Sequence, residues 1–203
     1  MFEKENTHYV CYVTRGLVAV NMLVFLLFEV LGSNLDTMFM MEHGAMFTPY
    51  LLVQTEWYRL FTSMFLHFGI RHLLNNMLLL YVLGDYLEKY LGRVKFLLLY
   101  VIAGVGANIV SGIVCLWQND VVVSAGASGA VFGILGGLLW VILRNKGRVE
   151  NLTIKKMTVM AVLSLYYGFV SEGVDNVAHV TGLILGFVLA MLFYRKKSAY
   201  QQI

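Results

Sequence analysis

Three polar sites interrupt a sequence that is 59% hydrophobic and only 13% charged, and their residue types could perform catalysis. The first is Ser128 in Gly126-Ala127-Ser128-Gly129, the second is His179, and the third is the pair His72 and Asn76. A serine hydroxyl becomes a nucleophile when an imidazole accepts its proton. Histidine and asparagine side chains can donate hydrogen bonds to the oxyanion that then forms. Together these side chains are the components of an acyl-transfer site.

The tetrapeptide around Ser128 has two interpretations. Ser128 stands near the start of an apolar run, and the free N–H groups and the dipole of a helix N-terminus favour negative charge. Small residues in membrane helices also serve close packing alone, and Gly133, Gly136 and Gly137 follow in the same run. Taken by itself, the tetrapeptide is more typical of packing than of catalysis.

His179 shares one helix face with two glycines. Gly182 and Gly186 follow it at i+3 and i+7. A face lined by glycine can lie close to the glycine-rich run that begins near Ser128, which would bring the imidazole to the hydroxyl. By itself, His179 is more typical of a histidine that is hydrogen-bonded inside a bundle.

His72 and Asn76 are spaced i, i+4, so a helix presents both on one face. Both side chains can donate hydrogen bonds, as an oxyanion site requires. The same pair is equally typical of polar contacts between helices. His67 and Asn75 lie nearby and weaken the signal.

A soluble domain carries about 25% charged residues, whereas this sequence carries 13%. This deficit indicates a membrane protein, so membrane-spanning helices must position the three sites. A spanning helix needs about 20 mostly apolar residues. The sequence therefore predicts an all-α polytopic membrane protein in which residues 1–203 form a single domain. Its six predicted spans are 13–32, 60–84, 94–116, 126–143, 157–170 and 177–194.

The distribution of lysine and arginine predicts the orientation of these spans, since inner segments carry most of the positive charge. With both termini inside, every lysine and arginine except Arg59 and Arg71 falls on the inner side. Ser128, His179 and the pair His72 and Asn76 then all lie a few residues below the outer face. Independent packing roles would not require this agreement in depth.

Other protease chemistries find less support in the sequence. Every lysine falls on the inner side, away from Ser128, which argues against a Ser–Lys dyad. The His-Glu-x-x-His motif of zinc proteases does not occur, so we expect no metal. A paired-aspartate site needs two aspartates within spans, and the sequence places none there except Asp85 at an inner edge.

With these motifs in this order, the chain resembles the rhomboid intramembrane serine proteases. The matching elements are Gly126-Ala127-Ser128-Gly129, His72-x-x-x-Asn76, and Ala178-His179-x-x-Gly182-x-x-x-Gly186, together with Trp57-Tyr58-Arg59 and Gly84 to Gly92 with Glu88. The resemblance extends from about residue 10 to residue 194. It implies a six-helix rhomboid-like core with no cofactor.

The resemblance also implies a role for each site residue. Ser128 would be the nucleophile and His179 the general base, in a dyad that needs no aspartate. His72, Asn76 and the Ser128 N–H would form the oxyanion hole. Phe132, one turn after Ser128, matches a family position whose aromatic ring stacks on the catalytic histidine. Many members have tyrosine there, and phenylalanine keeps the stacking but lacks the hydroxyl.

The implied substrates are single-pass membrane proteins that are cut near the outer leaflet, and the lipid bilayer is the other partner. We expect a multi-pass protein of a bacterial plasma membrane that binds no nucleic acid, because the basic residues form no single patch. Cys11 and Cys115 fall on opposite sides of the membrane, which excludes a disulfide between them.

Two other functions stay open at this point. One is a catalytically inactive rhomboid-like protein that binds transmembrane helices. The other is a small transporter or channel with His67, His72 and His179 in a proton path, although no inverted repeat or broken pair of helices supports it.

The short fifth span predicts where substrate reaches the site. We expect its outer half, Tyr166 to Val170 next to Ser171-Glu172-Gly173, to move and admit substrate from the lipid. In the closed state Tyr166, Tyr167 and Phe169 would pack on the second span.

Overall fold

The structure is a computed structural model that describes residues 9–171 and 173–196. Its helices are α1 (Tyr12–Leu31), α2 (Thr37–Glu42), α3 (Thr48–Val53), α4 (Arg59–Thr62), the 3-10 turn η1 (Ser63–Phe65), α5 (Gly69–Leu91), α6 (Arg93–Gln118), α7 (Ser128–Arg144), α8 (Ile154–Val170) and α9 (Asn176–Phe193). Two antiparallel strand pairs join them, β1 (Met46–Phe47) with β2 (Val123–Ser124) and β3 (Arg148–Val149) with β4 (Leu152–Thr153). Lys4, Glu172 and Lys197, which entered the sequence predictions, lie outside the described residues.

Several of these helices have the length and composition of membrane spans. Among the described residues α1, α6 and α9 are long and apolar enough to cross a bilayer. The apolar helix α7 is shorter, with 17 residues and a length of about 25 Å. These helices confirm a largely helical, multi-pass membrane protein, whereas the count of six spans and their orientation stay predictions.

The predicted span at 60–84 does not form one continuous helix. Residues 59–68 instead form α4, η1 and a short extended segment, and α5 begins at Gly69. The chain changes direction at Gly69, which has a φ of +79°. Residues other than glycine rarely adopt this value. Hydropathy does not register such a break, because the residues on both sides of it are apolar. At its other end α5 continues to Leu91.

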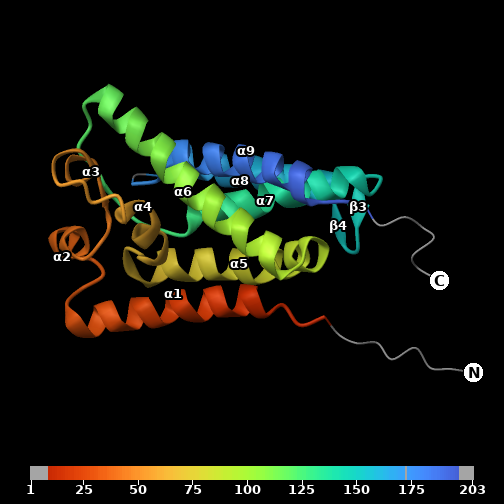
Figure 1. Cartoon of the computed structure of the whole chain (residues 1–203), viewed down its shortest axis with the longest axis horizontal. Coiled ribbons are helices and arrows are strands. Elements are labelled where there is room, and N and C mark those ends of the chain that lie inside the picture. The colour runs from red at the N-terminus through yellow and green to blue at the C-terminus, as the bar shows by residue number, and fades with distance from the viewer. Residues whose placement is uncertain (1–8, 172, 197–203) are drawn as a thin grey trace, which may run out of the picture.

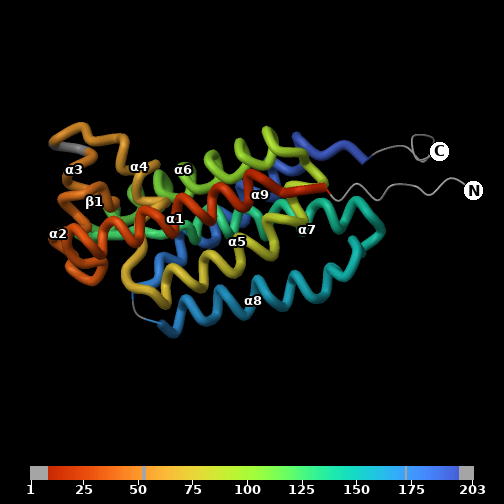
Figure 2. Tube along the Cα trace, turned by 90° about the horizontal axis from the view of Figure 1, so that it is seen from below, coloured from red at the N-terminus to blue at the C-terminus, as the bar shows by residue number. Residues whose placement is uncertain are grey.

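The helix α7 occupies the centre of the bundle. Most of its residues are buried, and it packs against α9, α6 and α5. Figure 1 shows α1 along one edge of the bundle beside α5, with α6, α7 and α9 beyond it. Figure 2 shows α8 along an outer edge of the bundle, beyond α5, and only Met157, Ala161 and Gly168 of this helix are buried. The bundle therefore has a tightly packed centre, and α1 and α8 are both loosely packed outer helices.

Glycines set the distance between α7 and α9. A Cβ atom at Gly182 would overlap the carbonyl oxygen of Gly129, and one at Gly186 would overlap that of Gly133. Neither position can accept a larger residue unless the backbones separate. The two helices therefore touch backbone to backbone, which brings the start of α7 against the start of α9.

A buried carboxylate fastens α1 to α5. Glu88 of α5 accepts hydrogen bonds from the hydroxyl of Thr14 at 2.7 Å, from the N–H of Thr14 at 2.7 Å and from the N–H of Val13 at 3.2 Å. The Val13 and Thr14 N–H groups lie in the first turn of α1, where they have no partner within the helix. Glu88 thus satisfies both orphan donors and holds the helix end in place.

A buried arginine organises the long connection between α1 and α5. Arg59 is 2% exposed, and its Nη1 donates to the carbonyl oxygens of Met41 at 2.5 Å and Ala45 at 2.9 Å. Its Nε donates to Glu56 at 2.5 Å, which neutralises the buried charge. The connection is therefore a fixed part of the fold next to the N-terminus of α7.

Candidate active site

Ser128 is the first residue of α7 and is half-buried. The loop before it is held by backbone hydrogen bonds, one from the Gly126 N–H to the Ser63 carbonyl oxygen at 2.9 Å. The N–H of the next residue, Ala127, donates to Nε2 of His67 at 3.4 Å. Gly126 has a φ of +145°, which favours glycine at this position. These contacts fix the hydroxyl at a helix N-terminus, where orphan N–H groups favour an anion.

His179 lies in the first turn of α9, and Asp175 sets the start of that helix. Oδ1 of Asp175 accepts from the N–H of Ala178 at 2.8 Å, and its backbone oxygen accepts from the N–H of His179 at 3.1 Å. Its second oxygen, Oδ2, accepts a short hydrogen bond from the hydroxyl of Ser111 on α6. The turn that carries the imidazole is therefore capped and tied to a neighbouring helix.

The imidazole of His179 stacks on the ring of Phe132. Their centroids are 4.2 Å apart and their planes are inclined by 14°. Phe132 lies one turn after Ser128 on α7, so the stack holds the imidazole beside the helix that carries the hydroxyl. Nδ1 of His179 is buried and has no hydrogen-bond partner among the described residues. Its ring orientation therefore depends on packing rather than on a carboxylate.

Ser128 and His179 have neighbours that touch each other. A Cβ built on Gly129, the residue after Ser128, would lie 3.8 Å from the carbonyl oxygen of Ala178, the residue before His179. This approach follows from the backbone contact between α7 and α9. The structure thus brings together the two segments that the sequence singled out separately.

His72 and Asn76 both lie on α5. A Cβ on Gly126 would lie 2.8 Å from Nε2 of His72 and 3.8 Å from the hydroxyl oxygen of Ser128, so imidazole and hydroxyl flank the same glycine. Asn76 is buried, and its Nδ2 donates to the carbonyl oxygen of His72 at 3.1 Å. This hydrogen bond uses one of the two N–H groups of the amide. The other N–H is left to donate elsewhere.

His67 has a structural position that its sequence context did not predict. Its ring is fully buried and meets the ring of His72 edge to face, with centroids 5.1 Å apart. Through Nε2 it accepts from the loop before Ser128. His67 therefore supports the backbone beside the site.

Sequence reasoning missed four polar residues that support the site. Asn108 donates to the hydroxyl of Ser63 at 3.0 Å and to the carbonyl oxygen of Leu60 at 2.8 Å, which fixes the segment that receives the Gly126 N–H. With Asn108 and Ser63, the other two missed residues are Asp175 and Ser111, whose hydrogen bond ties the start of α9 to α6. An aspartate directly before a helix is a capping signal that could have identified Asp175. No comparable sequence signal identifies the contacts that Asn108 and Ser111 make from α6.

The predicted packing of the fifth span on the second is wrong in its details. Tyr166, Tyr167 and Phe169 are 64%, 64% and 72% exposed, so they do not pack on α5. The buried stripe of α8 turns these rings outward. The hollow between α5, α7 and α8 is lined instead by Leu79, Leu83, Val131, Phe132, Leu135, Met160 and Ser164.

Two further observations concern metals and thiols. No group of three or more histidine, cysteine, aspartate or glutamate side chains gathers into a metal site within residues 9–171 and 173–196. Cys11 and Cys115 are free thiols, and the Cys11 Sγ donates to the carbonyl oxygen of Asp85 at 3.3 Å.

Comparisons with known proteins identify relatives over most of the chain. A family model described as the Rhomboid domain matches residues 54–196. Over 173 residues the chain is 38% identical to rhomboid protease GluP of Bacillus subtilis (strain 168), an alignment that covers 85% of this chain and 33% of that protein. It is 42% identical over 139 residues to RHOMBOID-like protein 4 of Arabidopsis thaliana, covering 66% of this chain and 34% of the other. With the Bacillus subtilis rhomboid-family protein YdcA it shares 34% identity over 142 residues, 70% of each chain. The chain thus spans about a third of the length of the first two relatives.

Proposed function

Since the chain belongs to the rhomboid family, we propose that it is an intramembrane serine endopeptidase in which Ser128 is the nucleophile and His179 the general base. The observation that carries this proposal is the stack of His179 on Phe132, one turn after Ser128. It directs a buried imidazole to the helix that bears the hydroxyl. Relatives named as proteases, such as GluP, support the class of reaction.

In the proposed reaction, His179 removes the proton from the Ser128 hydroxyl as Oγ attacks the scissile carbonyl carbon. The resulting imidazolium then gives this proton to the leaving amine, and the Ser128 ester remains. Water, activated by the same imidazole, hydrolyses the ester and restores the hydroxyl. Phe132 takes over the orienting role that a carboxylate has in a triad, because Nδ1 of His179 has no partner among the described residues.

The negative charge of the tetrahedral intermediate needs donors beside Ser128. The N–H of Ser128 is one, because the first N–H groups of α7 have no partner within the helix. His72 is the second, since its imidazole flanks Gly126 together with the Ser128 hydroxyl. Asn76 is the third, with one amide N–H not used by the carbonyl of His72. A preorganised group of donors of this kind is often the largest single contribution to catalysis.

We propose one membrane domain over residues 1–203 with six spans and both termini on the inner side. The start of α1 and the end of α9 lie at the same end of the bundle, which supports an even number of spans (Figure 1). The distribution of lysine and arginine supports the inner side for this end. The site then faces the outer half of the membrane, and single-pass membrane proteins are the substrates. Relatives from Bacillus support a bacterial plasma membrane.

The substrate must approach Ser128 sideways from the lipid, because its own flanks are embedded. The loosely packed α8 can yield because few of its residues are buried, and unlike α1 it lines a hollow that also contains Phe132. We propose that substrate passes between α5 and α8, where Leu79 and Met160 line the small hollow that ends at Phe132.

A fluorophosphonate probe tests the proposal, because it labels a serine that an adjacent base activates. The purified protein should be labelled at Ser128 and should cut a single-span substrate, and Ser128→Ala should do neither while its circular dichroism stays unchanged. Ser33→Ala is the matched control, since Ser33 caps a turn in the outer connection and should leave both signals intact. A folded protein without labelling and without turnover would support the inactive or the transporter alternative.

A further inference from the structure

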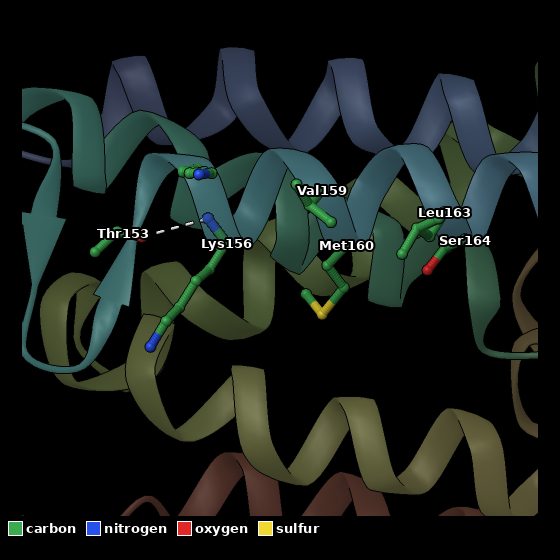
Figure 3. Close-up of a pocket in the computed structure, with 7 residues that line it drawn as sticks. Thr153, Lys156, Val159, Met160, Leu163 and Ser164 are labelled. Carbon is green, nitrogen blue, oxygen red and sulfur yellow. Dashed lines mark hydrogen bonds between the residues drawn. The ribbon is translucent and has the colours of Figure 1, made fainter.

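A groove of about 620 Å³ runs along α8 at the end of the bundle where α1 begins and α9 ends. It is lined by Thr153, Lys155, Lys156, Val159, Met160, Leu163 and Ser164. Figure 3 shows Met160 and Ser164 pointing away from α8 toward α5. These two residues also line the smaller hollow with Leu79 and Leu83 of α5. The groove therefore opens on the α5 side of α8.

The lining changes from cationic to apolar along the helix. Lys155 and Lys156 lie in the first turn of α8 and are exposed. Val159, Met160 and Leu163 follow over the next two turns. The Lys156 amine donates to the carbonyl oxygen of Asn151 at 3.2 Å, which directs it to the groove mouth without neutralising its charge.

The carboxylate of Glu150, in the turn before β4, is already paired. Glu150, which precedes the β4 strand, lies 3.6 Å from the Lys89 amine at the end of α5. Lys155 and Lys156 form no ion pair within the part of the chain that the structure describes. The mouth of the groove therefore carries a net positive charge next to an apolar channel.

We propose that this groove binds one anionic phospholipid, with its phosphate against Lys155 and Lys156 and an acyl chain along Val159, Met160 and Leu163. Basic pockets between transmembrane helices at the inner surface suit lipid headgroups of this kind. The volume lies within the range of roughly 300–1,000 Å³ that is typical of ligand sites. A phospholipid matches both ends of the lining with one molecule.

Other occupants fit this groove less well. A helix is at least about 10 Å wide, so three turns fill roughly 1,300 Å³, about twice the volume of the groove. A transmembrane substrate would therefore enter only in the open state of α8 proposed above, whereas the groove described here belongs to the closed state. A free phosphate would use the lysines alone and leave the apolar lining uncovered. A flexible acyl chain is narrow enough to enter the groove as it stands.

Native mass spectrometry of the intact protein tests the site without any requirement for proteolysis. The protein, carrying Ser128→Ala to prevent self-cleavage, is incubated with phosphatidylglycerol or with phosphatidylcholine of the same acyl chains. We expect it to retain one phosphatidylglycerol in preference to phosphatidylcholine. Lys155→Gln with Lys156→Gln should weaken this preference by roughly 30-fold, from about 1 kcal/mol for each lysine. Because binding is read directly, its failure would leave the proposed protease untouched.

Two further sets of variants distinguish lipid binding in the groove from a general attraction of anionic lipid to positive charge at the membrane surface. Lys146→Gln with Arg195→Gln removes two exposed charges at the same end of the bundle and should leave the preference intact. Leu163→Trp should fill the apolar part of the groove and lower retention, whereas Val162→Trp, which is similarly exposed but does not line the groove, should not.

Three outcomes would overturn the proposal. They are equal retention of both lipids, loss of preference in the Lys146 and Arg195 variant to the same extent, and displacement of the lipid by millimolar inorganic phosphate. The last would reduce the site to a free-anion site.

Discussion

Replacing Asp175 should reveal how firmly the first turn of α9 is held. Its carboxylate makes two contacts, one with the Ala178 N–H at the helix start and one with the Ser111 hydroxyl on α6. Asp175→Ala removes both, Ser111→Ala removes only the contact between helices, and Asp175→Asn keeps the capping oxygen but removes the charge. His179 lies in this turn, so stability and catalysis should both respond.

The expected magnitudes follow from these contacts. Loss of an N-cap costs about 0.5–2 kcal/mol. A hydrogen bond to a charged group contributes about 1.5–3 kcal/mol, and the half-exposed position of Asp175 favours the lower end. Asp175→Ala should therefore lower the free energy of unfolding by about 2–3 kcal/mol, and Ser111→Ala by about 1–2 kcal/mol. Asp175→Asn should lie nearer to wild type, since asparagine is an equally good cap.

The unfolding free energies can be measured in mixed micelles by circular dichroism as the fraction of denaturing detergent rises. Cleavage of a single-span substrate gives kcat and KM for the same variants. Fraying of the first turn should lower kcat about ten-fold, for a cost near 1.4 kcal/mol, and leave KM nearly unchanged. Asp36→Ala removes an equivalent cap from the distant helix α2 and should leave kcat unchanged.

A double-mutant cycle decides whether the contact with Ser111 has the assigned role. In the Asp175→Ala background, Ser111→Ala should cost almost nothing, because its partner has already gone. If it costs as much there as in the wild type, the hydrogen bond to Asp175 contributes nothing and the reasoning is refuted. An unchanged kcat in Asp175→Ala would separately refute the link to His179.

Three further predictions test the proposed site and its supporting helices. His179→Ala should be inactive, and adding Ser128→Ala should lower the rate no further, because a nucleophile and its base act as a unit. A double variant clearly slower than both single variants in single-turnover assays would contradict this. Asn76→Ala should lower kcat by up to roughly 10²–10³-fold, less if other donors compensate, and a change in KM alone would identify Asn76 as a substrate contact. Gly182→Ala should destabilise the bundle by separating α9 from α7, whereas Gly16→Ala, with nothing within 4 Å, should be neutral or slightly stabilising in the same micelle titration.

The sequence predicted the long helices well, because a run of apolar residues is a sufficient signal for a helix in lipid. The predicted first, third, fourth and sixth spans agree with α1, α6, α7 and α9 to within two residues at each end. The predicted start of the second span was wrong, because α5 begins at Gly69. The chain turns there through the positive φ of a glycine, with no change of polarity. Hydropathy reports where a chain can be buried but carries no information on where it bends.

The site was accessible to sequence reasoning only in its reactive groups. Ser128, His179 and His72 are polar residues in apolar runs, so each is conspicuous. The supports for these groups are tertiary contacts, such as the bond between Ser111 and Asp175, and sequence spacing cannot reveal them. The prediction that the aromatic residues of α8 pack on α5 was wrong for a related reason, because the face that a helix buries depends on its neighbours.

The backbone contact between α7 and α9 has a consequence for how this protein would choose its substrates. Glycines at 129, 133, 182 and 186 leave no slack between the helices that carry Ser128 and His179, so their relative geometry is set before any substrate arrives. If Ser128 and His179 act as proposed, discrimination would occur during admission past α8 and not through assembly of this pair. Substrates that differ in how easily they unwind should differ in kcat/KM, and once seated they should react at similar rates.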